Sequence, residues 1–187
     1  MKSIDAMWIC GLIGFVLAYP VYSQEVQKVD ADALHNLYKL NDSLYRSEQP
    51  DREAMRELEQ LGIMTVLNTR NRISDSRRIR GTSLRPVHVP INAWQMSQDD
   101  LVMAMRALHR AQKPVLVHCL HGSDRTGAII AAYRMIDEGW SREEAISEFR
   151  EARFGYHHRW FPGILELLET LDIEEVRMKV GRVPGQN

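Results

Sequence analysis

The sequence has few cysteines and almost no net charge. Two cysteines among 187 residues exclude a disulfide-rich scaffold, because such scaffolds are short and dense in cysteine. The 24 basic and 25 acidic residues leave a net charge of −1, which argues against a protein that binds nucleic acid. Repeats and low-complexity stretches are also lacking. With 44% hydrophobic and 26% charged residues, the composition is that of a globular protein, and the length fits one domain.

The longest apolar run lies near the N-terminus, from Ala6 to Tyr19. It is too short to span a bilayer comfortably, since a spanning helix needs ~20 apolar residues. With Lys2 before this run and Pro20 after it, residues 1–23 have the three-part form of a secretory signal peptide. We expect cleavage after Ser23, which predicts a periplasmic or otherwise secreted protein. The alternative is an uncleaved membrane anchor.

Cleavage after Ser23 would remove Cys10 and leave Cys119 as the one cysteine of the mature chain. A single thiol cannot form a disulfide within the chain. In an exported protein, a leftover cysteine indicates either a bond between chains or a reactive thiol. The residues around Cys119 therefore decide what this thiol does.

The rest of the chain alternates predicted strands and helices. Apolar runs predict strands at residues 43–46, 63–67, 86–91 and 114–118. Helical spacing and capping residues predict helices at residues 51–61, 97–112, 128–138, 141–153 and 163–180. This alternation implies an α/β fold, a single domain with a mainly parallel central sheet flanked by helices.

We expect this domain to cover residues 43–180. Residues 24–42 are polar and are expected to form an N-terminal extension that packs on the domain, and residues 181–187 a flexible tail. In parallel sheets, ligands bind beyond the carboxyl ends of the strands. The segment after residues 114–118 is therefore the place to expect a binding site.

That segment reads His118-Cys119-Leu120-His121-Gly122-Ser123-Asp124-Arg125-Thr126-Gly127. A loop that leaves a strand and opens a helix points backbone N–H groups inward, and the helix dipole adds positive potential. This field would bind an oxyanion such as phosphate and stabilise a thiolate on Cys119. Arg125 carries a planar fork that can bind two phosphate oxygens. A thiolate beneath a bound oxyanion, with an arginine opposite, is equipped to take a phosphoryl group.

The spacing His-Cys-x5-Arg-Thr-Gly resembles the signature of the cysteine-dependent protein tyrosine phosphatase superfamily. Residues 45–50 and 62–70 are also similar to the small bacterial dual-specificity-like phosphatases, and the export signal adds a likeness to the periplasmic TpbA group. The resemblance covers residues 43–160. It implies the phosphatase fold, in which the phosphate-binding cysteine loop joins a strand to a helix, and it implies no metal and no other cofactor.

The resemblance also implies a mechanism. Cys119 would attack phosphorus and form a phosphocysteine, while Arg125 and the loop N–H groups hold the phosphate oxygens. Thr126 would donate a hydrogen bond to the cysteine sulfur, and His118 would support the loop. The remaining members of the substrate-binding loop would be Leu120, His121, Gly122, Ser123 and Gly127.

The proton donor is the one part of the family pattern that the sequence does not supply. The family takes it from an Asp roughly thirty residues before the cysteine, but Asn92 stands there and cannot donate a carboxyl proton. Asp99 and Asp100 are candidates, although helix capping explains them more simply. Asp124 is another candidate, because the order Asp-Arg-Thr resembles the loops of myotubularin and Sac-type lipid phosphatases. Its alternative role is to orient Arg125 or the loop amides.

Two further segments are candidates for the rim of the site. Residues 68–85 hold Arg70, Arg72, Arg77, Arg78, Arg80 and Arg85. Arg70 and Arg72 follow a predicted strand and are expected nearest the site, where they would attract phosphorylated substrates. Residues 156–160 read Tyr-His-His-Arg-Trp, and two adjacent histidines alone make a weak metal site.

We expect a secreted phosphatase that acts on phosphotyrosine, with phosphoserine and phosphothreonine as further substrates. Its partner would be a phosphorylated protein, such as an exported domain of a membrane protein. The first alternative is a phosphoinositide or inositol-phosphate phosphatase with the same cysteine chemistry. A rhodanese-like sulfurtransferase is disfavoured by Thr126 and Gly127, and an inactive phosphate-binding module by the presence of both Cys119 and Arg125.

Overall fold

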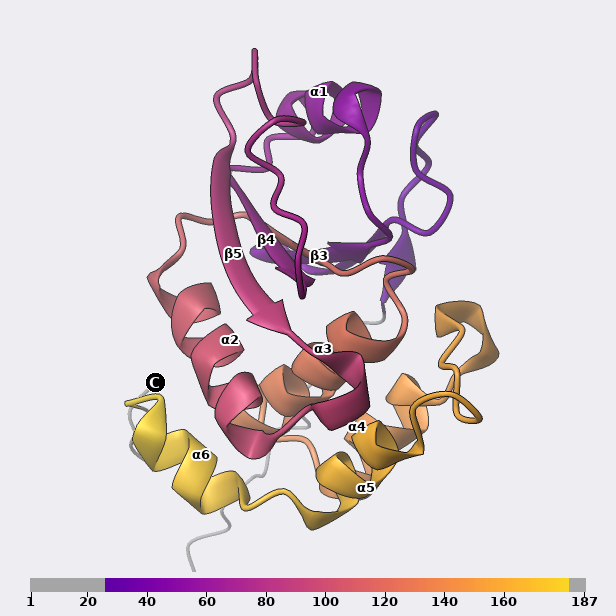
Figure 1. The fold of residues 1–187 in the computed structure, drawn as a ribbon, viewed down its shortest axis with the longest axis vertical. Coiled ribbons are helices and arrows are strands. Elements are labelled where there is room, and N and C mark those ends of the chain that lie inside the picture. The colour runs from indigo at the N-terminus through magenta and orange to yellow at the C-terminus, as the bar shows by residue number, and fades with distance from the viewer. Residues whose placement is uncertain (1–25, 182–187) are drawn as a thin grey trace, which may run out of the picture.

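A six-stranded sheet runs through the protein in the order β1-β2-β3-β6-β4-β5 (Figure 1). The computed structural model describes residues 26–181. The strands are β1 (Gln27–Lys28), β2 (Tyr38–Asn41), β3 (Leu44–Ser47), β4 (Thr65–Arg70), β5 (Arg85–Ile91) and β6 (Val115–His118). Strands β3, β6, β4 and β5 are parallel, whereas β1 and β2 add an antiparallel edge. The mainly parallel sheet that the sequence predicts is confirmed.

Helices cover both faces of this sheet (Figure 1). They are α1 (Arg52–Gln60), α2 (Gln98–Arg110), α3 (Asp124–Ile136), α4 (Arg142–Phe149), α5 (Pro162–Thr170) and α6 (Ile173–Lys179), with short 3-10 turns η1 (Ala93–Gln95) and η2 (Ala152–Phe154). The central strand β6 shows why both faces are apolar. Val115 and Val117 pack into the core with α2 to α6, and Leu116 between them packs into the core with α1. Burial on both faces explains the continuous apolar run of this strand.

Polar N-cap residues begin several helices where the sequence predicts them. Asp51 accepts hydrogen bonds from the first backbone amides of α1. Ser97 and Asp100 form a capping box at α2, and Ser141 and Glu144 form another at α4. These caps fix where the helices that follow the strands begin.

The prediction of one long helix over residues 163–180 is wrong. Helix α5 ends at Thr170, Leu171 is extended, and α6 starts after Asp172, whose side chain accepts from the amide of Glu175. The capping tendency of Asp172 outweighs the continuous apolar pattern. The helix expected to reach residue 153 ends at Phe149 and is followed by η2.

The segment before residue 43 is part of the sheet rather than a loose extension. Strands β1 and β2 pair with each other, and β2 pairs with β3. Leu34, Leu37 and Leu40 are almost fully buried. The expected signal peptide at residues 1–23, and residues 182–187 of the expected tail, lie outside the described residues. Within residues 26–181, no helix is long and apolar enough to cross a membrane.

Candidate active site

The cysteine loop, residues 119–123, joins the carboxyl end of β6 to the start of α3. Its base is deeply buried, with His118, Cys119 and Thr126 at most 1% exposed. Leu120 and His121 are exposed at the outer end of the loop. Helix α3 begins at Asp124, earlier than the predicted residue 128, which places Arg125 in its first turn. The thiol therefore lies at the buried base of the loop, and the loop opens to the surface at Leu120 and His121.

Five consecutive carbonyls of this segment are held from outside the loop. The donors are Thr69 Oγ1 to His118 (3.0 Å), His118 Nδ1 to Cys119 (2.9 Å), Gln49 N to Leu120 (3.0 Å), Asn36 Nδ2 to His121 (2.7 Å) and Arg46 Nη2 to Gly122 (2.8 Å). In a planar trans peptide, the N–H points away from the carbonyl of the preceding residue. The amides of residues 119–123 therefore point into the loop, as an oxyanion site requires.

The start of α3 adds to this positive site. Ser123 occupies the N-cap position but makes no side-chain cap hydrogen bond, so the first amides of the helix remain available to a ligand. Arg125 donates from Nη1 to the carbonyls of Thr69 (3.4 Å) and Ile91 (3.2 Å), at the ends of β4 and β5. Its Nε is buried and has no partner among the described residues. This unbonded donor is suited to a phosphate oxygen.

The Thr126 hydroxyl is also buried and has no partner among the described residues. The hydrogen bond to the cysteine sulfur that the resemblance implies is therefore not formed in this structure. A buried unpaired hydroxyl is costly, and such groups gather where a ligand completes the bonding. The Thr126 hydroxyl is thus available to form a hydrogen bond with a ligand in the loop.

Two glycines let the loop approach its neighbours closely. Gly122 has a φ of +72°, and a Cβ there would lie 2.5 Å from the carbonyl carbon of Ser47. A Cβ on Gly127 would lie 2.8 Å from the ring of Phe149. Both distances are shorter than van der Waals contact, so neither position accepts a side chain without movement. The two glycines fix the loop against β3 and α4.

Arg46 of β3 supports the loop from behind. It is 2% exposed, donates to the Gly122 carbonyl, and stacks 4.0 Å from the ring centre of Phe154. Burial lowers the pKa of its guanidinium to about 10, although the charge of Glu148 partly offsets this effect. The sequence analysis used Arg46 as part of a predicted strand and of the segment that resembles small bacterial phosphatases, and it missed this supporting role. The available signal was a charged residue within a predicted strand.

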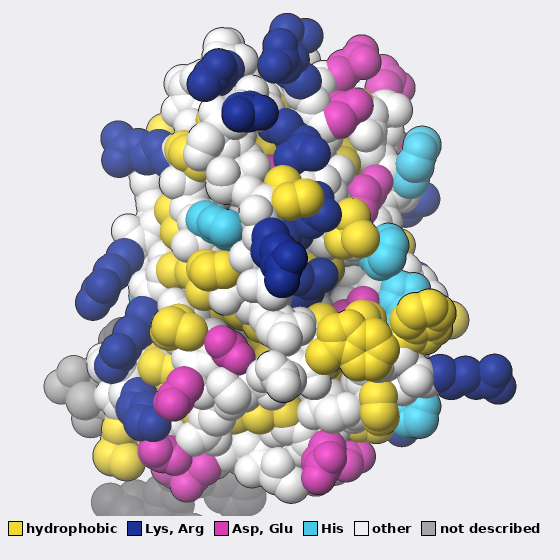
Figure 2. Space-filling model, viewed as in Figure 1, with side chains coloured by type: hydrophobic (Ala, Val, Ile, Leu, Met, Phe, Trp, Pro, Cys, Tyr) yellow, Lys and Arg dark blue, Asp and Glu magenta, His cyan; other side chains and the backbone are white. Residues whose placement is uncertain are grey.

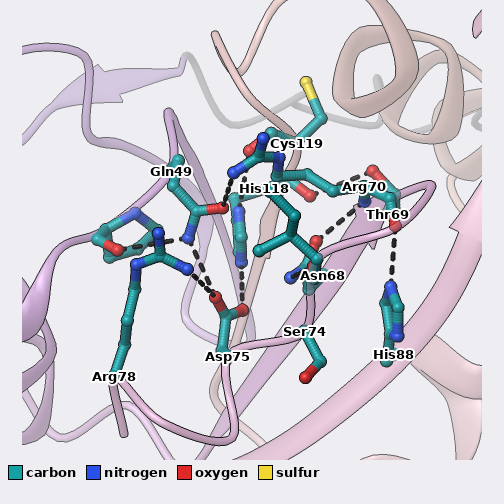
Figure 3. A network of polar contacts seen from close by, with 12 residues as sticks. Gln49, Asn68, Thr69, Arg70, Ser74, Asp75, Arg78, His88, His118 and Cys119 are labelled. Carbon is teal, nitrogen blue, oxygen red and sulfur yellow. Dashed lines mark hydrogen bonds and ion pairs between the residues drawn. The ribbon is translucent and has the colours of Figure 1, made fainter.

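Asp75 supports the loop from the other side, through a chain of hydrogen bonds (Figure 3). His118 Nε2 lies 2.7 Å from its Oδ2, and Gln49 Nε2 donates to its Oδ1 at 2.9 Å. Arg70 in turn donates to Gln49 Oε1 at 3.0 Å. These hydrogen bonds therefore connect the Arg70 side chain to the carbonyl of Cys119 through Gln49, Asp75 and His118. Sequence reasoning did not single out Asp75, because nothing local pairs it with a histidine 43 residues later.

The carboxyl of Asp75 is held in its charged form. Burial alone would raise its pKa, but hydrogen bonds from His118 and Gln49 and the charge of Arg78 outweigh burial and lower it. A carboxylate and a carbonyl can only accept, so both ring nitrogens of His118 act as donors. The expected supporting role of His118 thus depends on a buried ion pair.

Asn92, at the family's usual acid position, and the candidate acids Asp99 and Asp100 all lie in capping or surface positions. Asn92 caps η1 by accepting from the Trp94 amide. Asp100 belongs to the capping box of α2, and Asp99 forms an exposed ion pair with Lys179 of α6. These contacts agree with the capping interpretation of Asp99 and Asp100. None of the three contributes a hydrogen bond to the cysteine loop.

Asp124, in contrast, belongs to the site. It is 3% exposed, and its carboxylate accepts from the main-chain amide of His157 (2.9 Å) and lies 3.0 Å from His157 Nδ1. The rings of His157 and His121 lie 5.2 Å apart. One ligand atom from each of these three residues lies within 4.8 Å of the others, the one such group in the described part of the chain that could hold a metal. The adjacent His158 is not part of the group.

The rim of the site is basic on one side and aromatic on the other. Figure 2 shows basic side chains gathered over the upper part of this face, with hydrophobic side chains and histidines beside them. Burial lowers the pKa of Arg70, and the nearby charges of Arg78 and Arg125 lower it further, which shows that these cations lie close together. Trp94 and Trp160 are 66% and 64% exposed. Trp160 donates its main-chain amide to the carbonyl of His157, and Trp94 packs against Phe161, so both exposed rings lie near the residues around Asp124. Large exposed aromatics favour contact with a ligand or protein.

Comparisons with known proteins agree with this geometry. The family model for the dual specificity phosphatase catalytic domain matches residues 44–168. The dual specificity protein phosphatase TpbA of Pseudomonas aeruginosa is 31% identical over 154 residues, which cover 75% of this chain and 68% of TpbA. The inositol diphosphatase DSP5 of Arabidopsis thaliana is 23% identical over 153 residues, covering 74% and 70% of the two chains.

The fold comparison leads to the same group of proteins. The crystal structure of P. aeruginosa TpbA in complex with phosphotyrosine superposes with a TM-score of 0.73 at 27% identity, covering 83% of this chain and 94% of that one. The family model's range, residues 44–168, includes the parallel strands and the cysteine loop. The TpbA-like fold expected from the sequence is confirmed. The chain belongs to the dual specificity phosphatase family.

Proposed function

We propose that this phosphatase hydrolyses phosphotyrosine in proteins through a phosphocysteine intermediate on Cys119, and that it acts in the periplasm or another secreted location. The observation that carries the proposal is the cysteine loop. The carbonyls of residues 118–122 are held outward, the amides that follow them and the unbonded Nε of Arg125 face inward, and the thiol lies at the buried base of the loop. This arrangement stabilises a trigonal phosphoryl group next to sulfur.

The reaction follows from this geometry in two steps. The Cys119 thiolate attacks phosphorus in line with the leaving oxygen, so that an S–P bond forms as the P–O bond breaks. The loop amides and Arg125 hold the three equatorial oxygens, whose charge is spread most widely in the transition state. Water then attacks the phosphocysteine, releases phosphate and restores the thiolate. The Thr126 hydroxyl, which is buried and unbonded before the reaction, would donate to the departing sulfur.

The preference for phosphotyrosine is supported by depth and by the aromatic rim. Cys119 is 1% exposed, so a long rigid side chain carries its phosphate to the thiol more easily than a short one. Trp94 and Trp160 provide apolar surface for residues that flank the phosphorylated side chain. The match to TpbA, whose structure contains phosphotyrosine, supports the same substrate. Phosphoserine and phosphothreonine would react more slowly.

A second candidate substrate is an inositol phosphate or phosphoinositide. The observation that favours it is a set of basic side chains beside the loop: Arg70 donates to Gln49, which donates to Asp75, and Arg78 lies 3.8 Å from the same Asp75 carboxylate. Burial lowers the pKa of Arg70, and the charges of Arg78 and Arg125 lower it further. Such a concentration of cations is suited to a substrate with several phosphate groups. The relative DSP5 is described as an inositol diphosphatase. The family match favours either phosphatase reaction over the sulfurtransferase alternative.

Export is supported by the sequence of residues 1–23 alone. The apolar run and the small residues around Ser23 have the form of a cleaved signal. Exported domains of membrane proteins are the phosphorylated partners that an enzyme in such a compartment could reach. Expression of the full chain with fractionation, and N-terminal sequencing of the product, tests both statements. A product that begins at Gln24 supports them, and an uncleaved product in the cytoplasm contradicts them.

The substrate is tested by hydrolysis of a matched panel with the chain from Gln24 to Asn187. The panel contains a phosphotyrosine peptide, its phosphoserine counterpart, a phosphoinositide and an inositol polyphosphate. We expect the highest kcat/KM on the phosphotyrosine peptide. A higher value on an inositol phosphate would support the second candidate. Arg78→Gln should then weaken that activity selectively, because Arg78 adds positive charge near Arg70 while its side chain lies 3.8 Å from the Asp75 carboxylate.

A further inference from the structure

The proton donor is the missing part of the proposed reaction. Release of a tyrosine phenolate benefits from a proton donor, typically by 10²–10⁴-fold. Asn92 caps η1, Asp100 caps α2, and Asp99 pairs with Lys179. The donor must therefore come from a different element beside the cysteine loop.

The pair formed by Asp124 and His157 is in such a place. Asp124 directly precedes Arg125, and His157 lies on the segment between η2 and α5. The Asp124 carboxylate oxygens lie 3.0 and 3.2 Å from His157 Nδ1, and one of them also accepts from the His157 main-chain amide. Two bonds from one residue to one buried carboxylate fix the imidazole. They leave Nε2 as the ring nitrogen without a partner among the described residues.

The pair also lies on the correct side of the loop. In-line attack places the leaving oxygen opposite the sulfur, and so away from the buried floor at Cys119. His157 is 41% exposed at its side chain, and its ring lies 5.2 Å from that of His121 at the exposed end of the loop. A group at this position meets the substrate on the side from which the phenolate departs.

The ring, rather than the carboxyl, is the proton carrier in this pair. Both close contacts of the Asp124 carboxylate come from nitrogens of His157, one of them a main-chain N–H that can only donate. A proton on Asp124 would compete with these bonds, whereas a proton on His157 Nδ1 strengthens them. A buried carboxylate that orients an imidazole through Nδ1 leaves Nε2 to transfer protons, as in the Ser-His-Asp triad.

We propose that His157 is the general acid of this phosphatase and that Asp124 is its positioning residue, an inference that rests on the proposed function. In the first step, the Nε2–H of the imidazolium passes its proton to the phenolic oxygen as the P–O bond breaks and the S–P bond forms. Neutral His157 then takes a proton from the water that attacks the phosphocysteine. Phosphate leaves, the thiolate is restored and the imidazolium is regenerated. The expected acid role of Asp124 thus moves to the residue that it orients.

The test compares leaving groups that differ in their need for a proton. The variant His157→Gln is assayed on a phosphotyrosine peptide and on 2,4-dinitrophenyl phosphate, whose phenol is strongly acidic and leaves without a proton. EDTA is present throughout, so that a metal at His121, Asp124 and His157 does not contribute. We expect kcat on the phosphotyrosine peptide to fall roughly 10²-fold or more, with a much smaller change on dinitrophenyl phosphate.

Two further variants separate chemistry from structure. Asp124→Asn should show the same selective loss to a smaller degree, since an amide oxygen can still accept one bond from His157. His158→Gln, on the adjacent histidine outside the pair, should leave both activities unchanged. Thermal melts of each variant establish that it is folded.

Each outcome has a defined meaning. An equal loss on both substrates in folded His157→Gln would make its role structural and overturn the inference, as would full activity on phosphotyrosine. Wild-type protein that hydrolyses dinitrophenyl phosphate but no phosphotyrosine would instead contradict the proposed function, and the acid role would fall with it.

Discussion

Replacement of Asp75 by alanine should destabilise the protein far more than the loss of a surface carboxylate. The side chain is 1% exposed and accepts from His118 and Gln49. Alanine leaves the buried His118 Nε2 without its acceptor, whereas the partly buried Gln49 Nε2 keeps only the Pro50 carbonyl. Removal of one partner from a buried ion pair costs about 3–5 kcal/mol. For a chain of this size, that loss corresponds to a fall in Tm of roughly 6–20 °C.

Asp75→Asn separates charge from hydrogen bonding at the same position. The asparagine oxygen can still accept from Gln49, and its amide can donate to an uncharged His118 ring. The hydrogen bonds are then kept and only the ion pair is lost, so we expect a smaller cost of about 1–2 kcal/mol. Asp42→Ala is the matched surface control, since Asp42 is 87% exposed and pairs only with Lys39. Its Tm should be that of the wild type.

The effect should also depend on pH in a defined direction. The pKa of Asp75 is lowered in the folded protein, so its stabilising effect is complete above the unfolded value of about 3.9 and is lost as the pH falls through the folded value. Urea unfolding of wild type and Asp75→Asn at a series of pH values measures this. The difference in unfolding free energy should shrink below about pH 4. Asp75→Ala with the Tm of the Asp42→Ala control would refute the ion-pair role.

Three other substitutions test the residues that pack against the cysteine loop and the exclusion of Asp99 as the general acid. Gly127→Ala should cost about 1–3 kcal/mol because its Cβ meets the Phe149 ring, and Phe149→Leu in the same chain should recover part of that loss in a thermal melt. Arg46→Met should lower kcat about 10- to 100-fold without changing the far-UV circular dichroism spectrum, because the Gly122 carbonyl loses a charged donor. Asp99→Asn should leave kcat and KM on a phosphotyrosine peptide unchanged, since Asp99 pairs with Lys179 on the surface.

The sequence predicts the cysteine loop well because the loop is contiguous. The strand, the thiol, the glycines and Arg125 follow one another within residues 115–127, and their order alone implies an anion site at the start of a helix. The parallel sheet can be predicted equally well from the sequence, because its buried strands are continuous apolar runs. Local caps such as Asp51 and Ser97 also act where the sequence places them.

The supports of the loop could not be predicted in the same way. Arg46 and Asp75 reach the loop only because the sheet order places β3 and β4 on either side of β6. The pairing of Asp124 with His157 depends on the path of the chain after η2, which no local pattern specifies. The division of the last helix at Asp172 follows from a single capping residue that an otherwise helical pattern concealed.

The most direct test of the account is detection of the covalent intermediate. Protein comprising residues 24–187 is mixed with a phosphotyrosine peptide and quenched in acid within one turnover. The intact protein and its peptides are then examined by mass spectrometry. We predict one added phosphoryl group, located on Cys119. The variant Cys119→Ser should carry no phosphoryl group and should release no phosphate. Phosphate release by Cys119→Ser, or a phosphoryl group on any other residue, would contradict the mechanism.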